Sequence, residues 1–156
     1  MQLLSQITTR LWLYTSACNE TSLVLEAIKQ CKVNLKVFPS ISLVDVDEAN
    51  YERQKTALKE ALQTYGTSNV LGITVGDKVM FNYLLERNSQ DPHGPLGLAA
   101  SSILKGRFTD IRKMLTSIDV TLPIGTADAS GYFNTDVLSA SDFGCAFTTP
   151  QLLTNN

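Results

Sequence analysis

Short runs of apolar residues alternate along this chain with longer segments in which apolar residues recur every three or four positions. The short runs are typical of buried strands, and the longer segments are typical of helices with one apolar face. Strands are predicted at residues 11–14, 33–44, 69–75, from 122–125 onward, and 143–147. Helices are predicted from Asn19 or Thr21 to Cys31, from Asp45 or Asp47 to Tyr65 with Gly66 closing, and at residues 79–88, 98–118 and 133–140.

This alternation predicts the fold class. Strands separated by helices of ten or more residues form βαβ units, which build a parallel sheet. We therefore expect one α/β domain with about five parallel strands. Because parallel sheets bind ligands at the carboxyl ends of their strands, a site should draw on the residues after each strand. These are residues 15–19, Asp45, and residues 76–78, 126–128 and 148–150.

Composition narrows the function classes. The chain has 156 residues, with 13 Lys+Arg against 15 Asp+Glu and a formal charge of −2. Nucleic-acid binding needs clustered basic residues, so we expect no nucleic-acid partner. No apolar run reaches the roughly 18 residues of a membrane span, so we expect no membrane partner. The absence of a signal-peptide pattern favours the cytoplasm slightly and leaves the compartment undetermined.

Several segments resemble one family. Residues 72–78, which read GITVGDK, and residues 80–84, which read MFNYL, resemble a motif of glycoside hydrolase family 17, the fungal β-1,3-glucanases and glucan transglycosylases. The family motif reads approximately G-V-T-V-G-N-E-x-x-x-N-Y-L. Further matches follow the family's order at residues 11–14, 18–21, 55–58, 65–66, 122–129 and 132–134. The resemblance covers residues 10–145.

The resemblance implies a fold and an assembly. The family fold is an eight-stranded (β/α) barrel, and the matched segments would be its second to sixth strands. Residues 1–156 would then form a single incomplete, truncated TIM-type barrel domain. Five strands cannot close an eight-strand barrel, because strand number, tilt and stagger are linked. The open sheet edges need a cover, and we expect a homodimer to supply it.

Position 78 is where the sequence departs from the family's chemistry. Retaining glycosidases use two carboxyl groups about 5–5.5 Å apart, one as acid and one as nucleophile. The resemblance implies a Glu acid at position 78, where this sequence has Lys78, and a nucleophile after a seventh strand that is not in this sequence. Asp77, which replaces the family Asn, has no partner carboxylate in the motif. We expect the family's hydrolysis to be absent and assign no catalytic residue.

Lys78 has three alternative roles. Burial could lower the pKa of a lysine amine and make it a nucleophile that forms a Schiff base with a carbonyl. The amine could instead contact an anionic or polar ligand. It could also form an inert ion pair with Asp77 or another carboxylate.

Other chemistry has little support. His93 lies in a proline-rich loop without Asp, Glu or Cys at metal-ligand spacing. No histidine is placed to activate a serine, and no glycine-rich phosphate loop is present. We therefore expect no metal and no cofactor. The cysteines, which lack paired spacing, are interpreted as small buried thiols: Cys18, Cys31 and Cys145.

The matched segments leave a candidate binding surface at the strand ends. Its members carry aromatic, amide, carboxylate or amine groups: Tyr14, Asn19, Asp77, Lys78, Asn82, Tyr83, Asp128 and Tyr132. Individually, Tyr83 and Tyr132 are also compatible with the core, and Asn19 and Asn134 with helix caps. Together they favour a pseudoenzyme that binds a β-glucan fragment, a metabolite or a pigment. The alternatives are an enzyme that uses Lys78 as nucleophile or base, and a structural or interaction protein.

Overall fold

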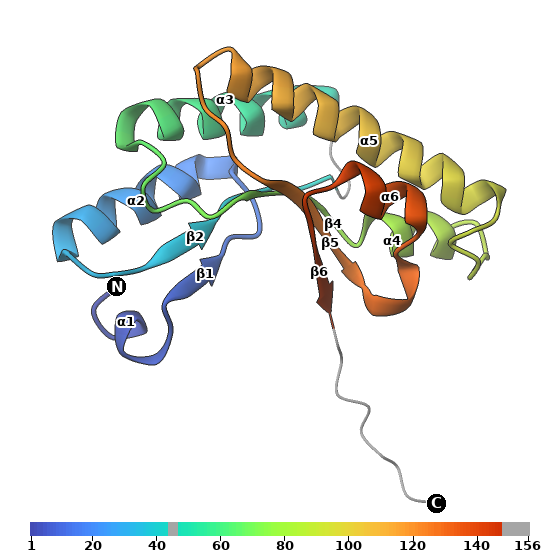
Figure 1. Cartoon of the computed structure of the whole chain (residues 1–156), viewed down its shortest axis with the longest axis horizontal. Coiled ribbons are helices and arrows are strands. Elements are labelled where there is room, and N and C mark those ends of the chain that lie inside the picture. The colour runs from blue at the N-terminus through green and yellow to red at the C-terminus, as the bar shows by residue number, and fades with distance from the viewer. Residues whose placement is uncertain (44–46, 148–156) are drawn as a thin grey trace, which may run out of the picture.

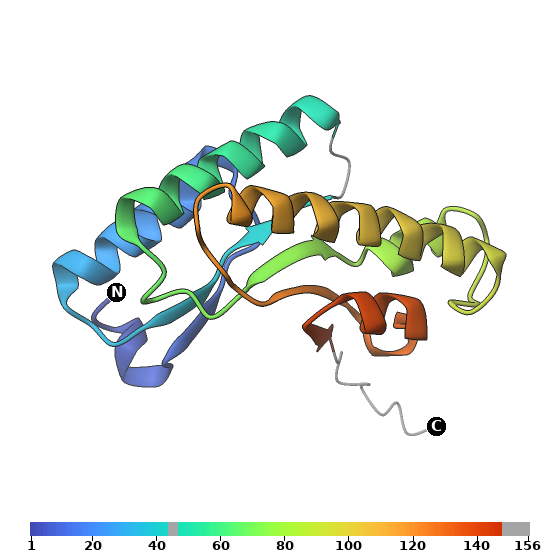
Figure 2. The same cartoon turned by 45° about the horizontal axis from the view of Figure 1, so that its top comes forward.

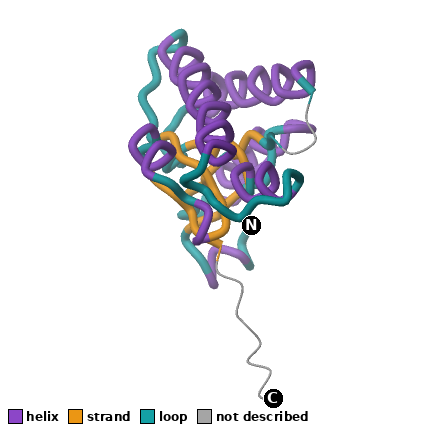
Figure 3. The backbone as a smooth tube through the Cα atoms, turned by 90° about the vertical axis from the view of Figure 1, so that its right-hand side faces the viewer, coloured by secondary structure: helices purple, strands orange, loops and turns teal. Residues whose placement is uncertain are grey.

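The computed structural model describes residues 1–43 and 47–147 and shows the three longest helices packed along one face of parallel strands (Figure 1). Seen from the side, the helices lie outside the strands (Figure 3). In chain order the elements are α1 (Leu4–Ile7), β1 (Arg10–Trp12), the 3-10 helix η1 (Ala17–Asn19), α2 (Glu20–Cys31), β2 (Lys36–Phe38), β3 (Ser40–Ile41), α3 (Glu48–Tyr65), β4 (Ile73–Asp77), α4 (Val79–Leu85), α5 (Pro95–Thr116), β5 (Ile124–Ala129), the 3-10 helix η2 (Ser130–Tyr132), α6 (Thr135–Ala140) and β6 (Phe143–Phe147).

Every hydrogen-bonded pair of strands is parallel, and the strands form a two-stranded sheet, β1-β2, and a four-stranded sheet, β3-β4-β5-β6, each in chain order. Pro39, which has no backbone N–H, separates β2 from β3 within one predicted strand. A bridge from Val37 to Val70 and a 2.9 Å hydrogen bond from the Thr74 N–H to the Pro39 carbonyl continue the sheet across this break. The predicted α/β class is confirmed, and the architecture is a partial (β/α) barrel. Within the described residues β1 and β6 are its outer strands.

The core lies between the sheet and the long helices α3 and α5 (Figure 2). Val37 and Ile73 from the sheet are fully buried, and so are Leu58 of α3 and Leu104 and Phe108 of α5. Each helix presents one apolar stripe to the strands, which explains why periodicity located both helices.

Local chemistry sets the helix ends. Asp47 caps α3 by accepting a 2.7 Å hydrogen bond from the Asn50 N–H, and Gly66 follows its last turn with φ of +71°. The alternative cap, Asp45, lies outside the described residues. Helix α5 begins at Pro95, three residues before the predicted start, because proline is tolerated in a first helical turn.

The structure also differs from the sequence pattern at several residues. Leu23 on α2 and Ile103 on α5 fit the helical apolar period, but their side chains are exposed. Leu23 lies on the face of α2 opposite its buried residues, and Ile103 lies at the margin of the buried stripe of α5; single apolar side chains are commonly left in water. The three cysteines are not buried thiols either, because Cys18 is exposed and Cys31 and Cys145 are half-buried. Helix α1 and the 3-10 helices have too few residues to show a period, and the sequence did not predict them.

The sheet face opposite the long helices carries aromatic side chains. Phe38 and Phe143 meet there edge to face, with ring centroids 5.4 Å apart. Gly72 and Gly125 leave room for the Phe143 ring, since a Cβ at Gly72 would lie 2.9 Å from that ring. Small residues on two neighbouring strands thus let one large aromatic residue lie flat against the sheet.

Candidate functional site

The carboxyl ends of β4 and β5 bring three of the predicted site residues together. Strand β4 ends at Asp77, and Lys78 follows in the left-handed conformation, with φ of 53°. The Lys78 N–H donates a 2.8 Å hydrogen bond to the Ala127 carbonyl of β5. Because the chain turns at Lys78, α4 begins at the next residue and lies directly beyond the strand.

Asp128 lies beneath this turn and has no exposed surface. Its carboxylate accepts hydrogen bonds from the N–H groups of Met80 at 2.8 Å, Phe81 at 3.3 Å and Ala129 at 2.8 Å. The first two are first-turn donors of α4, which have no partner inside a helix. Burial raises the pKa of Asp128 to about 6, although these three donors act in the opposite direction. Asp128 therefore holds the first turn of α4 in place.

Asp77 is half-buried, and its Oδ1 atom has no hydrogen-bond partner within the described part of the chain. Burial raises the pKa of its carboxyl above the ordinary value, while the nearby charge of Lys78 lowers it. A buried acceptor without a donor is costly.

The Lys78 side chain is exposed, and its amine lies 5.3 Å from the centre of the Phe147 ring of β6. This geometry is that of a cation–π contact. Among the described residues no carboxylate forms an ion pair with Lys78. The burial that would turn it into a nucleophile is not observed, so of its three alternatives the geometry favours contact with a polar ligand.

Aromatic side chains from the first and last strands meet beside Lys78. Trp12 of β1 lies 4.4 Å from the Tyr14 ring and 5.3 Å from the Phe147 ring, as centroid distances. The Trp12 indole N–H donates a 3.2 Å hydrogen bond to the Thr74 hydroxyl of β4, which fixes its orientation. Tyr14 is 63% exposed. We call Trp12, Tyr14 and Phe147 the strand-end aromatic surface.

The other predicted site residues lie elsewhere. Asn19 occupies the N-cap position of α2 without a side-chain capping bond and lines a separate hollow with Cys18 and Arg53. Tyr83 packs against the core and lies under the Arg87 guanidinium, 3.6 Å from its ring centre.

Two further predicted residues accompany α4. Tyr132 packs edge to face on Phe81, with ring centroids 5.0 Å apart. Asn82 is half-buried on the same helix as Phe81. Asn134 is a true cap, since its side chain accepts a 2.9 Å hydrogen bond from the Val137 N–H of α6. The core and cap alternatives therefore hold for Tyr83, Tyr132 and Asn134.

Sequence reasoning missed Trp12 and Phe147. Trp12 stands on the opposite strand face from its neighbour Leu11, which packs against the core. Phe143 and Phe147 are four residues apart on β6 and therefore point the same way. The alternation of side chains along each strand indicates that Trp12 and Phe147 lie on the face away from the helices. The apolar runs were interpreted instead as strands buried on both faces.

Two features that the described residues lack bear on other functions. No cluster of three or more His, Cys, Asp or Glu side chains there is arranged to hold a metal ion. No helix in that part of the chain is both long and apolar enough to cross a membrane.

Sequence comparisons connect this chain with glucan-active enzymes. No family model matches it. A glucan 1,3-β-glucosidase of Schizosaccharomyces pombe is 30% identical over 134 residues, which are 83% of this chain and 37% of that protein. A putative glucan endo-1,3-β-glucosidase, btgC, of Aspergillus niger is 26% identical over 145 residues, or 92% of this chain and 20% of the relative. The chain thus spans between about a fifth and somewhat more than a third of the length of these relatives.

Comparison with solved structures agrees with the sequence comparisons. Two structures of the Rhizomucor miehei β-1,3-glucanosyltransferase superpose on 92% of this chain with a TM-score of 0.65 and 22–23% identity. This chain covers 47% of either one. The fold is thus that of a partial (β/α) barrel. The resemblance to glycoside hydrolase family 17 is confirmed, and the chain is a family 17-like segment of such a barrel.

Proposed function

We propose that this chain binds a β-1,3-glucan segment at the strand-end aromatic surface and does not cleave it by the family mechanism. The observation that carries the proposal is the meeting of Trp12, Tyr14 and Phe147 beside Asp77 and Lys78 at the carboxyl edge of the sheet. Binding sites in proteins combine aromatic walls with a few polar groups that fix the ligand's orientation.

The ligand class follows from the chemistry of this surface. The C–H face of a β-linked glucose ring is apolar and packs on aromatic rings, while its hydroxyls need donors and acceptors. The exposed Lys78 amine offers a donor at this edge. The relatives are named for β-1,3-glucan, and one of the superposed structures holds laminaritriose. If the sugar does not bind, a metabolite or a pigment is the next ligand to test.

The carboxyl groups at this edge do not suit the two-carboxylate mechanism. That mechanism needs an acid and a nucleophile about 5–5.5 Å apart, both reaching the glycosidic bond. Lys78 occupies the position of the family's acid. Asp128 is buried and holds three backbone donors, so it cannot reach a sugar. Asp77 has one carboxylate oxygen buried.

Trp12 makes the proposal directly testable, because it is the chain's single tryptophan. Titration with laminarihexaose should change its fluorescence saturably. Tyr14→Ala should weaken binding at least about tenfold, because it removes an exposed ring in contact with Trp12. Leu23→Ala is the matched control, since Leu23 is also an exposed apolar side chain, 66% accessible, but lies on α2. A fluorescence change that is absent, or equal in all three proteins, would overturn the proposal.

The predicted homodimer rests on the outer strands. In the described chain β1 and β6 each have one neighbouring strand. Because all strands are parallel and in chain order, β6 of one copy could continue onto β1 of a second in the same sense. Light scattering on the purified 156-residue chain should then give twice the 17.1 kDa mass. A monomer that stays soluble at high concentration would refute the homodimer and leave the glucan proposal standing.

A further inference from the structure

The exposed charge at the carboxyl edge of the sheet is positive. The described strand ends at this edge are residues 13–19, 42–43, 76–79 and 127–133. Their charged side chains are Asp77, Lys78 and Asp128. Asp128 has no exposed surface, Asp77 is half-buried, and Lys78 is exposed. An exposed cation thus marks this edge in a chain whose net charge is −2.

The two carboxyl groups at this edge leave the charge of Lys78 available. Asp128 binds backbone N–H groups of α4 and of Ala129 with its oxygens. The charge of Lys78 lowers the pKa of Asp77, but burial outweighs this effect and raises that pKa above its ordinary value. Within the described chain no carboxylate lies at ion-pair distance from the Lys78 amine. An anionic group of a ligand can therefore pair with it.

The Lys78 amine has a defined position beside the strand-end aromatic surface. The backbone of Lys78 is held at the end of β4 by the 2.8 Å hydrogen bond to the Ala127 carbonyl. Its amine lies 5.3 Å from the centre of the Phe147 ring, and that ring lies 5.3 Å from the Trp12 ring. A sugar ring that packs on these aromatic residues therefore has an ammonium group next to it.

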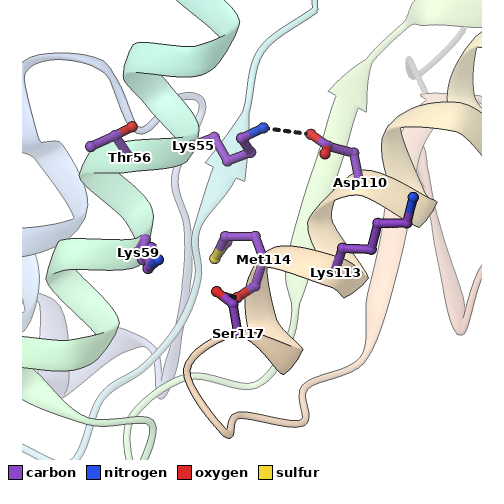
Figure 4. Close-up of a pocket in the computed structure, with 7 residues that line it drawn as sticks. All are labelled: Lys55, Thr56, Lys59, Asp110, Lys113, Met114 and Ser117. Carbon is purple, nitrogen blue, oxygen red and sulfur yellow. Dashed lines mark hydrogen bonds and ion pairs between the residues drawn. The ribbon is translucent and has the colours of Figure 1, made fainter.

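Other lysines of the chain are not placed in this way. Figure 4 shows the hollow between α3 and α5, where Lys55 is paired with Asp110 at 2.8 Å. The Lys113 amine points along α5, away from Lys59, so these two amines do not converge on one ligand. Lys78 differs because its amine is unpaired within the described chain and adjoins the strand-end aromatic surface.

The chemistry of an ammonium group favours one kind of sugar substituent. An ammonium group only donates hydrogen bonds, whereas an ionised carboxylate only accepts them. A sugar hydroxyl also accepts, but it is neutral, and a hydrogen bond between two charged groups is shorter and stronger. A carboxylate on the sugar therefore gains more from Lys78 than a hydroxyl does.

We propose that the strand-end aromatic surface selects β-1,3-glucan segments that carry a carboxylate, with the Lys78 amine binding that carboxylate. This inference rests on the proposed glucan binding and narrows its ligand from a neutral to an acidic sugar. The carboxylate has two sources: an oxidised C1 at the reducing end, or an oxidised C6 along the segment. Both present the same group to Lys78.

The test is a Trp12 fluorescence titration of the whole chain, at low ionic strength, with three sugars. They are laminaritriose, its C1-oxidised aldonic acid and its C6-oxidised uronic acid form. At least one acidic sugar should bind about three- to fivefold more tightly than laminaritriose, as an ion pair at an exposed amine allows. The preference should shrink as sodium chloride is added, because salt screens exposed charges.

Variants of Lys78 isolate the charge. Lys78→Gln should bind the neutral and acidic sugars equally, and Lys78→Arg, which keeps the charge, should retain the preference. Lys32→Gln is the matched control and should retain it as well. Lys32 is also an exposed lysine in the left-handed conformation, with φ of 52°, but it lies at the end of α2.

The outcomes separate this inference from the proposed function. A preference for the C1 or the C6 acid identifies the source of the carboxylate. Equal binding of neutral and acidic sugars by the wild-type chain would overturn the inference and leave glucan binding standing. A preference that survives in Lys78→Gln would overturn the role of Lys78. If none of the three sugars binds, the proposed function itself fails.

Discussion

Asp128 offers a prediction whose size follows from its surroundings. The carboxyl is buried at the end of β5, and burial raises its pKa in the folded chain to about 6, against an ordinary value of 3.8. A folded pKa above the unfolded one means that the protonated carboxyl is favoured by folding. The stabilisation is therefore complete below pH 3.8 and is lost as the pH rises through 6.

The magnitude follows from the shift. A difference of about two pKa units at 1.36 kcal/mol per unit amounts to about 3 kcal/mol across the full range. Between pH 7.5 and pH 5, the same titration changes the free energy of unfolding by about 1.4 kcal/mol. Asp128→Asn removes the titrating group, and an amide oxygen still accepts one bond from the first turn of α4. Its free energy of unfolding should lack this part of the pH dependence.

Urea denaturation at pH 7.5 and pH 5 measures the effect. The difference in the free energy of unfolding, wild type minus Asp128→Asn, should grow by about 1.4 kcal/mol at the lower pH. Asp119→Asn is the control, because Asp119 is an exposed carboxylate in the loop after α5. The reasoning is refuted if the two variants show the same pH dependence, or if the difference shrinks at pH 5.

Three further predictions concern packing and use the same denaturation measurement. Tyr51→Phe should lower the free energy of unfolding by about 1–1.5 kcal/mol, because it removes the hydrogen bond to the partly exposed Asp110; an unchanged value would make that bond irrelevant to stability. Gly125→Ala should cost about 1–3 kcal/mol, since the new Cβ meets Phe143; full stability would contradict the packing. Gly106→Ala, in an open stretch of α5, should instead stabilise by about 0.5–1 kcal/mol, and a loss there would show an unseen contact.

The strand and helix order was predictable because it depends on local apolar spacing. Tyr51, Leu58 and Leu62 of α3 all face the core, as a 3.6-residue period requires. A strand run such as residues 11–14 does not reveal which of its faces stays open. That depends on the curvature of the whole sheet, which brings Trp12 of β1 against Phe147 of β6.

The site was partly predictable for the same reason. Asp77 and Lys78 could be placed from sequence, because residues after parallel strands share one edge. Asp128 was placed at the same edge, but its burial under α4 depends on how that helix packs. Asn19 and Tyr83 were grouped with them by motif alone. The structure places Asn19 in a different hollow and packs Tyr83 on the core.

The central claim is binding of a β-1,3-glucan segment without cleavage. The most direct test is a native mass spectrum of the purified 156-residue chain after incubation with laminarihexaose. The account predicts a complex that carries the intact hexasaccharide and loses it in Tyr14→Ala. Shortened sugar that depends on the protein would contradict the non-catalytic claim, and a spectrum without any bound sugar would contradict the binding claim.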